Sequence, residues 1–160
     1  MATRSGSVDP GLLLWLLGRG IVPAELAEAL EHDSGLTGLA GTGDMRAVLA
    51  GASRGDEDAV LALEVYVHRL RAAIAAMATA LGGLDALVFT GRIGERAPEV
   101  RSRTAGGLAF LGVALDSSAN AAATGDAEIG AAGAAVRALV VESREDVEIA
   151  RGARAALGAT

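Results

Sequence analysis

Arginine is the residue type in this sequence best suited to handle phosphate. All 14 basic side chains are arginines, and lysine is absent. A guanidinium presents several donors in one plane and matches phosphate oxygens in pairs, whereas a P-loop depends on a lysine. We therefore expect any phosphate bound here to be held by arginine or by backbone N–H groups.

The segment Phe89–Pro98 has the pattern of a strand that ends in a Gly-x-x-Gly turn and leads into a helix. Glycines let a ligand approach the backbone closely, and the carboxyl ends of strands are the usual ligand site of open α/β sheets. The segment is neither a Walker A loop nor a G-x-G-x-x-G fingerprint, so it predicts no P-loop and no Rossmann site. From the residues alone, a purely structural turn is at least as good an interpretation.

Three further polar positions have a plain structural interpretation beside a functional one. Asp44 is placed to cap a short helix, and Glu145 stands at the start of the last helix, where the helix dipole favours an acid. His32 and His68 have no partners at metal-ligand spacing, and we assign both a structural role.

The composition excludes several classes of protein. The chain has 160 residues, of which 51% are hydrophobic and 2% aromatic, so we expect one domain with a core of small aliphatic side chains. The net charge of −6 argues against nonspecific nucleic-acid binding. The longest early apolar run, Leu12–Leu17, is too short for a bilayer, and the polar segment Thr3–Ser7 fits no signal peptide. Cysteine is absent, which excludes disulfides and thiolate metal sites and fits a cytoplasmic location.

Apolar periodicity and turn residues predict alternating helices and strands, which indicates an α/β layered domain. Expected helices are Gly11–Leu17, one from Pro23, Asp44–Leu49, Asp56–Leu81, Pro98–Phe110 and Glu145–Leu157. Expected strands are Leu84–Thr90, buried in a parallel sheet, Leu111–Leu115 and Val136–Val141. Ser34–Gly43 is expected to be a loop and Gly91–Glu95 a tight turn, and Ser117–Gly133 receives no assignment.

Several segments together resemble the acetate kinase family. Asp85–Glu95 reads D-A-L-V-F-T-G-R-I-G-E and is similar to that family's D-A-L-V-F-T-G-G-I-G-E-N. Thr3–Pro10 resembles its G-T-R-S-G-D-x-D-P, and the residues from Ser34 to Arg46 resemble its S-G-L-L-G-x-S-G-x-S-x-D-M-R. The segments Val100–Arg101, Gly107–Asp116 and Arg144–Arg151 also match, in the family's order and at about its spacing.

The resemblance implies a fold and an activity. Residues 1–160 would be the C-terminal, nucleotide-binding lobe of an actin-like ATPase fold, which is ribonuclease H-like and α/β, with the N-terminal lobe outside this chain. The implied reaction is reversible, Mg²⁺-dependent transfer of the γ-phosphate of ATP to acetate, which gives acetyl phosphate and ADP. The implied assembly is a homodimer or a complement to the other lobe, in the cytoplasm, with neither nucleic acid nor membrane as partner.

The resemblance also assigns residues by position. Arg4 matches the arginine that stabilises the transferring phosphoryl group, and Glu145 matches the carboxylate that helps to hold Mg²⁺. The nucleotide-contacting turn would be Asp44, Met45 and Arg46, and the adenosine loop would be Gly91, Arg92, Ile93, Gly94 and Glu95.

Departures from the family pattern leave alternatives open. Arg92 and Arg96 replace the usual Gly and Asn of the adenosine loop, while Ser7 and Ala2 replace an Asp and a Gly around Arg4. The alternatives are a catalytically inactive remnant that binds nucleotide or dimerises, and a propionate or butyrate kinase. Because the acyl pocket would lie in the other lobe, we expect the isolated chain to be inactive. Without that lobe the chain should expose apolar surface, so we also expect it to dimerise or aggregate.

Overall fold

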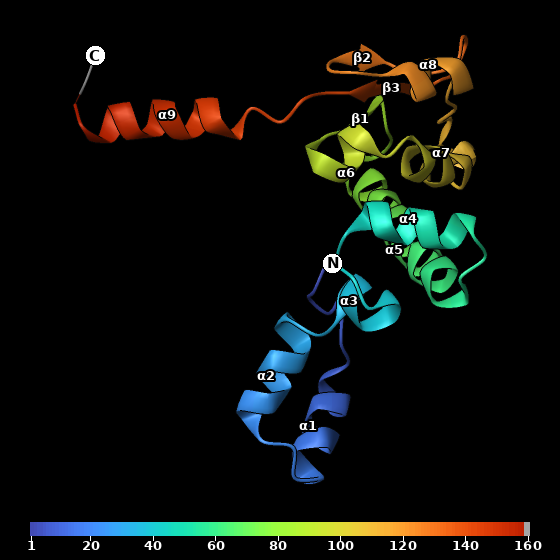
Figure 1. Cartoon of the computed structure of the whole chain (residues 1–160). Helices are drawn as coiled ribbons and strands as arrows, with labels where there is room; N and C mark the ends of the chain where they lie inside the picture. Colours follow the sequence, from blue (N-terminus) through green and yellow to red (C-terminus); the bar gives the residue numbers. More distant parts are fainter. Residues whose placement is uncertain (159–160) are drawn as a thin grey trace. The chain divides into compact units, whose positions relative to one another are not determined.

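A computed structural model of the chain describes residues 1–158. The chain forms two compact units, Met1–Ala73 and a second that begins at Ile74. The boundary lies inside one long helix, α5 (Glu57–Leu81), rather than in a linker. Figure 1 labels the elements used below. The helix that the apolar periodicity predicts over Asp56–Leu81 is confirmed.

The first unit is helical, and its helix starts are fixed by local chemistry. Asp9 and Asp44 each accept hydrogen bonds from amides of the following helix, which satisfies groups that a helix N-terminus leaves free. The predicted cap at Asp44 is confirmed, as are the helices predicted in this unit, although the helix that follows Asp44 extends to Ser53 rather than Leu49. Before α5 the helices are α1 (Pro10–Gly18), α2 (Pro23–Glu31), α3 (Gly35–Ala40) and α4 (Met45–Ser53).

The prediction of a loop over Ser34–Gly43 is wrong, because α3 lies within it. The amides of Leu36 and Thr37 donate to the carbonyls of Met1 and Ala2 at 2.9 and 3.0 Å. The Leu36 side chain is buried, with 1% of its surface exposed. Long-range backbone bonds and one buried leucine therefore outweigh the poor helix propensity of a glycine-rich segment.

The second unit contains a three-stranded sheet in the order β1-β3-β2. Strand β1 (Ala86–Phe89) pairs in parallel with β3 (Arg137–Val140), and β2 (Ala127–Glu128) pairs antiparallel with β3. The predicted parallel strand before the glycine turn is confirmed, as is the strand within Val136–Val141. Only alternate residues of β1 are buried, so one face of the strand is exposed rather than covered on both sides.

The remaining elements of the second unit within the described residues are helical. They are α6 (Gly91–Arg96), α7 (Pro98–Gly106), the 3₁₀ turn η1 (Ala109–Leu111), α8 (Ser117–Ala122) and α9 (Glu145–Ala156). Helix α7 packs against both α6 and α8. The core consists of aliphatic side chains and one phenylalanine, among them Leu87, Phe89, Leu108, Ile129, Val136 and Val140.

Three sequence predictions in this unit need correction. Gly91–Glu95 is not a tight turn but the body of helix α6. The helix that begins at Pro98 ends at Gly106 rather than Phe110. Leu111–Leu115 is not a strand, and its residues contribute only the isolated bridges Val113–Val136 and Leu115–Gly130.

Candidate functional site

The first unit carries Arg4 on an extended segment that backbone hydrogen bonds hold on both sides. The Ser34 amide donates to the Thr3 carbonyl at 2.8 Å, and the Ser5 amide donates to the Leu30 carbonyl at 2.7 Å. The Arg4 guanidinium is exposed, and within residues 1–158 its one ion pair, to Glu31, is 3.9 Å long. An exposed pair of that length contributes little energy, so the Arg4 side chain is free to move to another anion.

Gly35 fits the turn directly beneath this segment. Its φ is +62°, a conformation that favours glycine, and a Cβ there would lie 2.2 Å from the Met1 carbonyl oxygen and 2.9 Å from that of Arg4. The segment that carries Arg4 therefore rests against a position that only glycine can occupy without a shift of the backbone.

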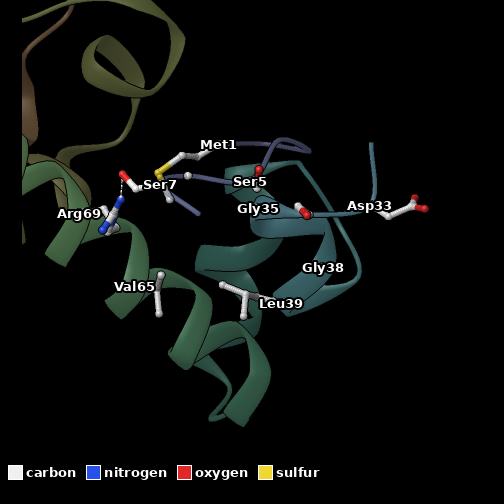
Figure 2. Close-up of a pocket in the computed structure, with 11 residues that line it drawn as sticks. Met1, Ser5, Ser7, Asp33, Gly35, Gly38, Leu39, Val65 and Arg69 are labelled. Carbon is white, nitrogen blue, oxygen red and sulfur yellow. Dashed lines mark hydrogen bonds between the residues drawn. The ribbon is translucent and has the colours of Figure 1, made fainter. Parts of the chain in front are cut away.

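A pocket of about 550 Å³ opens beside this segment, as Figure 2 shows. One of its walls comes from α5, whose Arg69 donates to the Ser7 hydroxyl at 2.6 Å. Arg4 itself does not line the pocket. The lining includes Ser5, Ser7, Gly35, Leu39, Val65 and Arg69.

Asp44, Met45 and Arg46 lie at the start of α4 in the same unit. The Asp44 carboxylate accepts from the Arg46 amide at 3.0 Å and pairs with both the Nε and Nη2 of Arg46, at 3.1 and 2.8 Å. These bonds from Arg46 lower the pKa of Asp44 and raise that of Arg46. Met45 is buried, so the polar groups that α4 offers to a ligand are those of Asp44 and Arg46.

In the second unit, Gly91, Arg92, Ile93, Gly94 and Glu95 form helix α6, which follows the end of β1. Arg92 is exposed, whereas Ile93, Gly94 and Glu95 are half-buried. A Cβ on Gly94 would lie 3.2 Å from the carbonyl carbon of Phe89, so α6 packs directly on the strand end. The glycine pattern thus allows close helix–strand packing as well as exposing backbone.

Glu145 is the first residue of α9. Its carboxylate is exposed and, within residues 1–158, makes no hydrogen bond or ion pair. The described part of the chain holds no group of three or more His, Asp or Glu residues that could bind a metal ion. His32 Nε2 lies 3.9 Å from a Glu28 carboxylate oxygen, and these two side chains belong to no such group. Any metal at Glu145 would therefore take the other ligands from elsewhere.

Two carboxylates that the sequence did not single out for this purpose position the segment before α9. The Glu95 carboxylate accepts from the Ser143 amide at 2.8 Å. Asp126 accepts from the Glu142 amide and from the Arg144 guanidinium, both at 2.8 Å. The bond from Arg144, followed by that from the Glu142 amide, lowers the pKa of Asp126. These contacts bring the segment that leads to Glu145 beside α6.

The structure thus brings the predicted residues together in two groups. Arg4 and the Asp44–Arg46 turn belong to the first unit, and Gly91–Glu95 and Glu145 belong to the second. Sequence reasoning missed the buried polar residues of the second unit, which are Arg101, Thr104 and Asn120. Helix α7 is mostly polar and has no distinct apolar face, so its sequence carries no signal that Arg101 is buried.

Comparisons with known proteins agree with these features. The sequence model of the acetokinase family matches residues 1–151. An acetate kinase of Gloeobacter violaceus is 48% identical over 153 residues, which cover 94% of this chain and 38% of that protein. This chain therefore spans less than half the length of the curated relatives that it matches.

Solved structures match just as closely. The crystal structure of Porphyromonas gingivalis acetate kinase superposes with a TM-score of 0.88 at 35% identity, over 95% of this chain and 39% of that one. A propionate kinase from Francisella tularensis gives a TM-score of 0.87 at 35% identity, over 94% and 38%. These neighbours have the actin-like ATPase fold, so the predicted fold class is confirmed. By sequence and by fold, the chain belongs to the acetokinase family.

Proposed function

We propose that residues 1–160 form the C-terminal, nucleotide-binding lobe of an acetate kinase. In the complete enzyme, a carboxylate oxygen of acetate would attack the γ-phosphorus of ATP, and the bond from that phosphorus to the β,γ-bridging oxygen would break. ADP would leave with the bonding electrons, and acetyl phosphate would form. Such transfer depends on positioning and on stabilisation of charge at the phosphoryl oxygens.

Each predicted site residue has a role in this proposal. Asp44, Met45 and Arg46 would contact the nucleotide from the first unit, and Gly91–Glu95 would contact its adenosine from the second. Arg4 would bind the phosphoryl group during transfer. Its exposed guanidinium makes one 3.9 Å pair, with Glu31, among the described residues, and this supports the role because so weak a contact is easily exchanged for a phosphate.

The residues present fit a magnesium ion at Glu145. The Glu145 carboxylate is exposed and unpaired among the described residues, so it is free to serve as one oxygen ligand. Mg²⁺ bound with nucleotides usually takes one or two protein carboxylates, with phosphate oxygens and water completing its shell. When bound, the ion would neutralise charge on the phosphates. The chain's own part is to hold the Glu145 carboxylate at the end of the segment that Glu95 and Asp126 fix.

One observation carries the proposal further than family membership alone. The bond from the Ser143 amide to the Glu95 carboxylate joins residues 48 apart in sequence. It brings the motif proposed to hold adenosine next to the motif proposed to hold the metal. A nucleotide that carries Mg²⁺ on its phosphates needs both groups near one another.

Calorimetric titration of the full chain with ADP, with and without Mg²⁺, tests the proposal. We expect saturable binding that Glu145→Gln weakens in the presence of Mg²⁺ but not in its absence. Asp146→Asn, on the same exposed helical turn, is the matched control and should leave both affinities unchanged. If a folded chain did not bind ADP, the proposal would be contradicted. The alternative of a catalytically inactive remnant that dimerises would then be favoured.

Propionate is the second candidate acceptor, because the propionate kinase matches this chain with the same identity and nearly the same TM-score as the acetate kinase. Assays of the complete enzyme with acetate, propionate and butyrate would compare kcat/KM for the three acids. A higher kcat/KM for propionate or butyrate than for acetate would replace the first assignment.

A further inference from the structure

Arg101 is a buried positive charge that no carboxylate of the described residues neutralises. It lies in α7 and exposes 1% of its surface. Burial lowers the pKa of its guanidinium, yet arginine remains protonated in proteins. Buried charges are normally paired with opposite charges, but Arg101 makes no ion pair with any residue from 1 to 158. The uncharged groups that accept hydrogen bonds from Arg101 must therefore account for its burial.

One side of the guanidinium closes the end of α6. Arg101 Nη1 donates to the carbonyls of Gly94 and Glu95, at 2.9 and 2.8 Å. The last carbonyls of a helix lack partners within it and carry partial negative charge, which a cation stabilises. Pro98 stands four residues after Gly94 and has no N–H to donate, so a side chain must supply the missing donor.

The other side of the guanidinium binds α8. Arg101 Nε donates to the Asn120 side-chain oxygen at 2.7 Å, and Nη2 donates to the Asn120 backbone carbonyl at 2.6 Å. The Asn120 amide nitrogen in turn donates to the Pro98 carbonyl at 3.0 Å. The planar guanidinium thereby joins α6, α7 and α8, an arrangement that the single ammonium of a lysine cannot reproduce.

The contact reaches the proposed site through Glu95. Its backbone carbonyl is held by Arg101, and its carboxylate accepts the Ser143 amide of the segment before Glu145. Helix α6 has only six residues, too few for stability of its own. An external contact at its C-terminal end therefore decides where its residues lie.

We propose that Arg101 is a positioning residue that holds Gly91–Glu95 in the conformation that binds nucleotide, through the carbonyls of Gly94 and Glu95. The inference rests on the proposed function, because it assigns nucleotide to this segment. Asn120 orients the guanidinium and so acts in the same way, one contact further from the ligand.

The test compares Arg101→Lys with a variant that loses stability through core packing alone. Val136→Ala removes a buried side chain from the same unit without touching Arg101 or α6, and so lowers the Tm through packing alone. Both full-length variants are titrated with Mg-ADP at a temperature where they are folded, and amide exchange is followed at residues 91–97. We expect Arg101→Lys to weaken binding about tenfold, or ~1.4 kcal/mol, and to speed exchange at residues 91–97. Val136→Ala should change the affinity by less than about twofold at a similar loss of Tm.

Wild-type affinity in a folded Arg101→Lys variant would overturn the inference and leave Arg101 a structural residue. If that variant does not fold, Asn120→Ala provides the same comparison, and an affinity within about twofold of wild type would overturn the inference equally. If the wild-type chain does not bind Mg-ADP, the proposed function fails. In that case, amide hydrogen exchange still tests the positioning role of Arg101. Faster exchange at residues 91–97 in Arg101→Lys supports this role, and unchanged exchange overturns it.

Discussion

The Glu95 carboxylate accepts a hydrogen bond from the Ser143 amide at 2.8 Å, across 48 residues of sequence. This contact ties α6 to the segment before α9. Both partners belong to the second unit, so the relationship is a property of that unit by itself. Variants of Glu95 test whether the contact serves ligand binding.

Glu95→Ala removes the acceptor, whereas Glu95→Gln retains a side-chain oxygen at nearly the same place. The loss of one hydrogen bond of this kind is worth roughly 1 kcal/mol, so we expect Glu95→Ala to weaken Mg-ADP binding about fivefold. Glu95→Gln should stay within about twofold of wild type. Calorimetry measures both affinities, and the ¹⁵N shift of the Ser143 amide reports the bond directly. Equal loss in the two variants would mean that the negative charge matters rather than the bond.

Acid should release the segment 142–144 through Asp126. The Arg144 guanidinium and the Glu142 amide hold the pKa of Asp126 below its ordinary value of 3.8. Because the pKa is lower in the folded chain, the stabilisation is fully present above the ordinary value and disappears as the pH falls through the lowered one. We expect the Glu142 amide shift to titrate with a midpoint below 3.8.

The control for this titration is Asp126→Asn, which keeps an oxygen acceptor but cannot titrate. Its Glu142 amide should show no transition in the same pH range. A transition that persists in Asp126→Asn would assign the effect to another group.

Gly35→Ala should displace the segment that carries Arg4. The new Cβ would meet the Met1 carbonyl oxygen at 2.2 Å in a residue with φ of +62°. Gly41→Ala is a close control, because Gly41 has φ of +67° and no atom near its Cβ position. We expect Gly41→Ala to cost about 1 kcal/mol for the left-handed conformation alone, and Gly35→Ala to cost about 3 kcal/mol or more. Thermal unfolding measures both, and equal losses of Tm would show that the segment moves aside without cost.

Helix α1 should drive self-association of the isolated chain. It has no buried residue, and Leu14 and Trp15 are 71% and 54% exposed. An apolar patch of this kind on a soluble surface favours contact with another apolar surface. Sedimentation should therefore show dimers or larger species, which Leu14→Glu shifts toward monomer. Ala24→Glu adds the same charge to exposed positions of α2 and should not shift the distribution. A wild-type chain that sediments as a monomer would contradict the prediction.

Local chemistry made several elements predictable. The carboxylates of Asp9 and Asp44 cap the helices that follow them, and the apolar spacing along Asp56–Leu81 specifies a long helix. These features depend on residues within a few positions of one another, so they can be read without knowledge of the fold. The glycine pattern after β1 was likewise visible, although its form as helix α6 was not.

The sequence by itself determined the family, the caps, the long helix and the parallel strand, because each depends on residues that lie close together along the chain. Only the tertiary structure decided that the glycine-rich residues 35–40 form a helix, since that helix needs the carbonyls of Met1 and Ala2. It also decided that Arg101 is buried against Gly94, Glu95 and Asn120. In sequence Arg101 resembles any exposed helical arginine. Its environment arises only when α6, α7 and α8 pack together, because the free energy of burying its charge is offset by carbonyls from other elements.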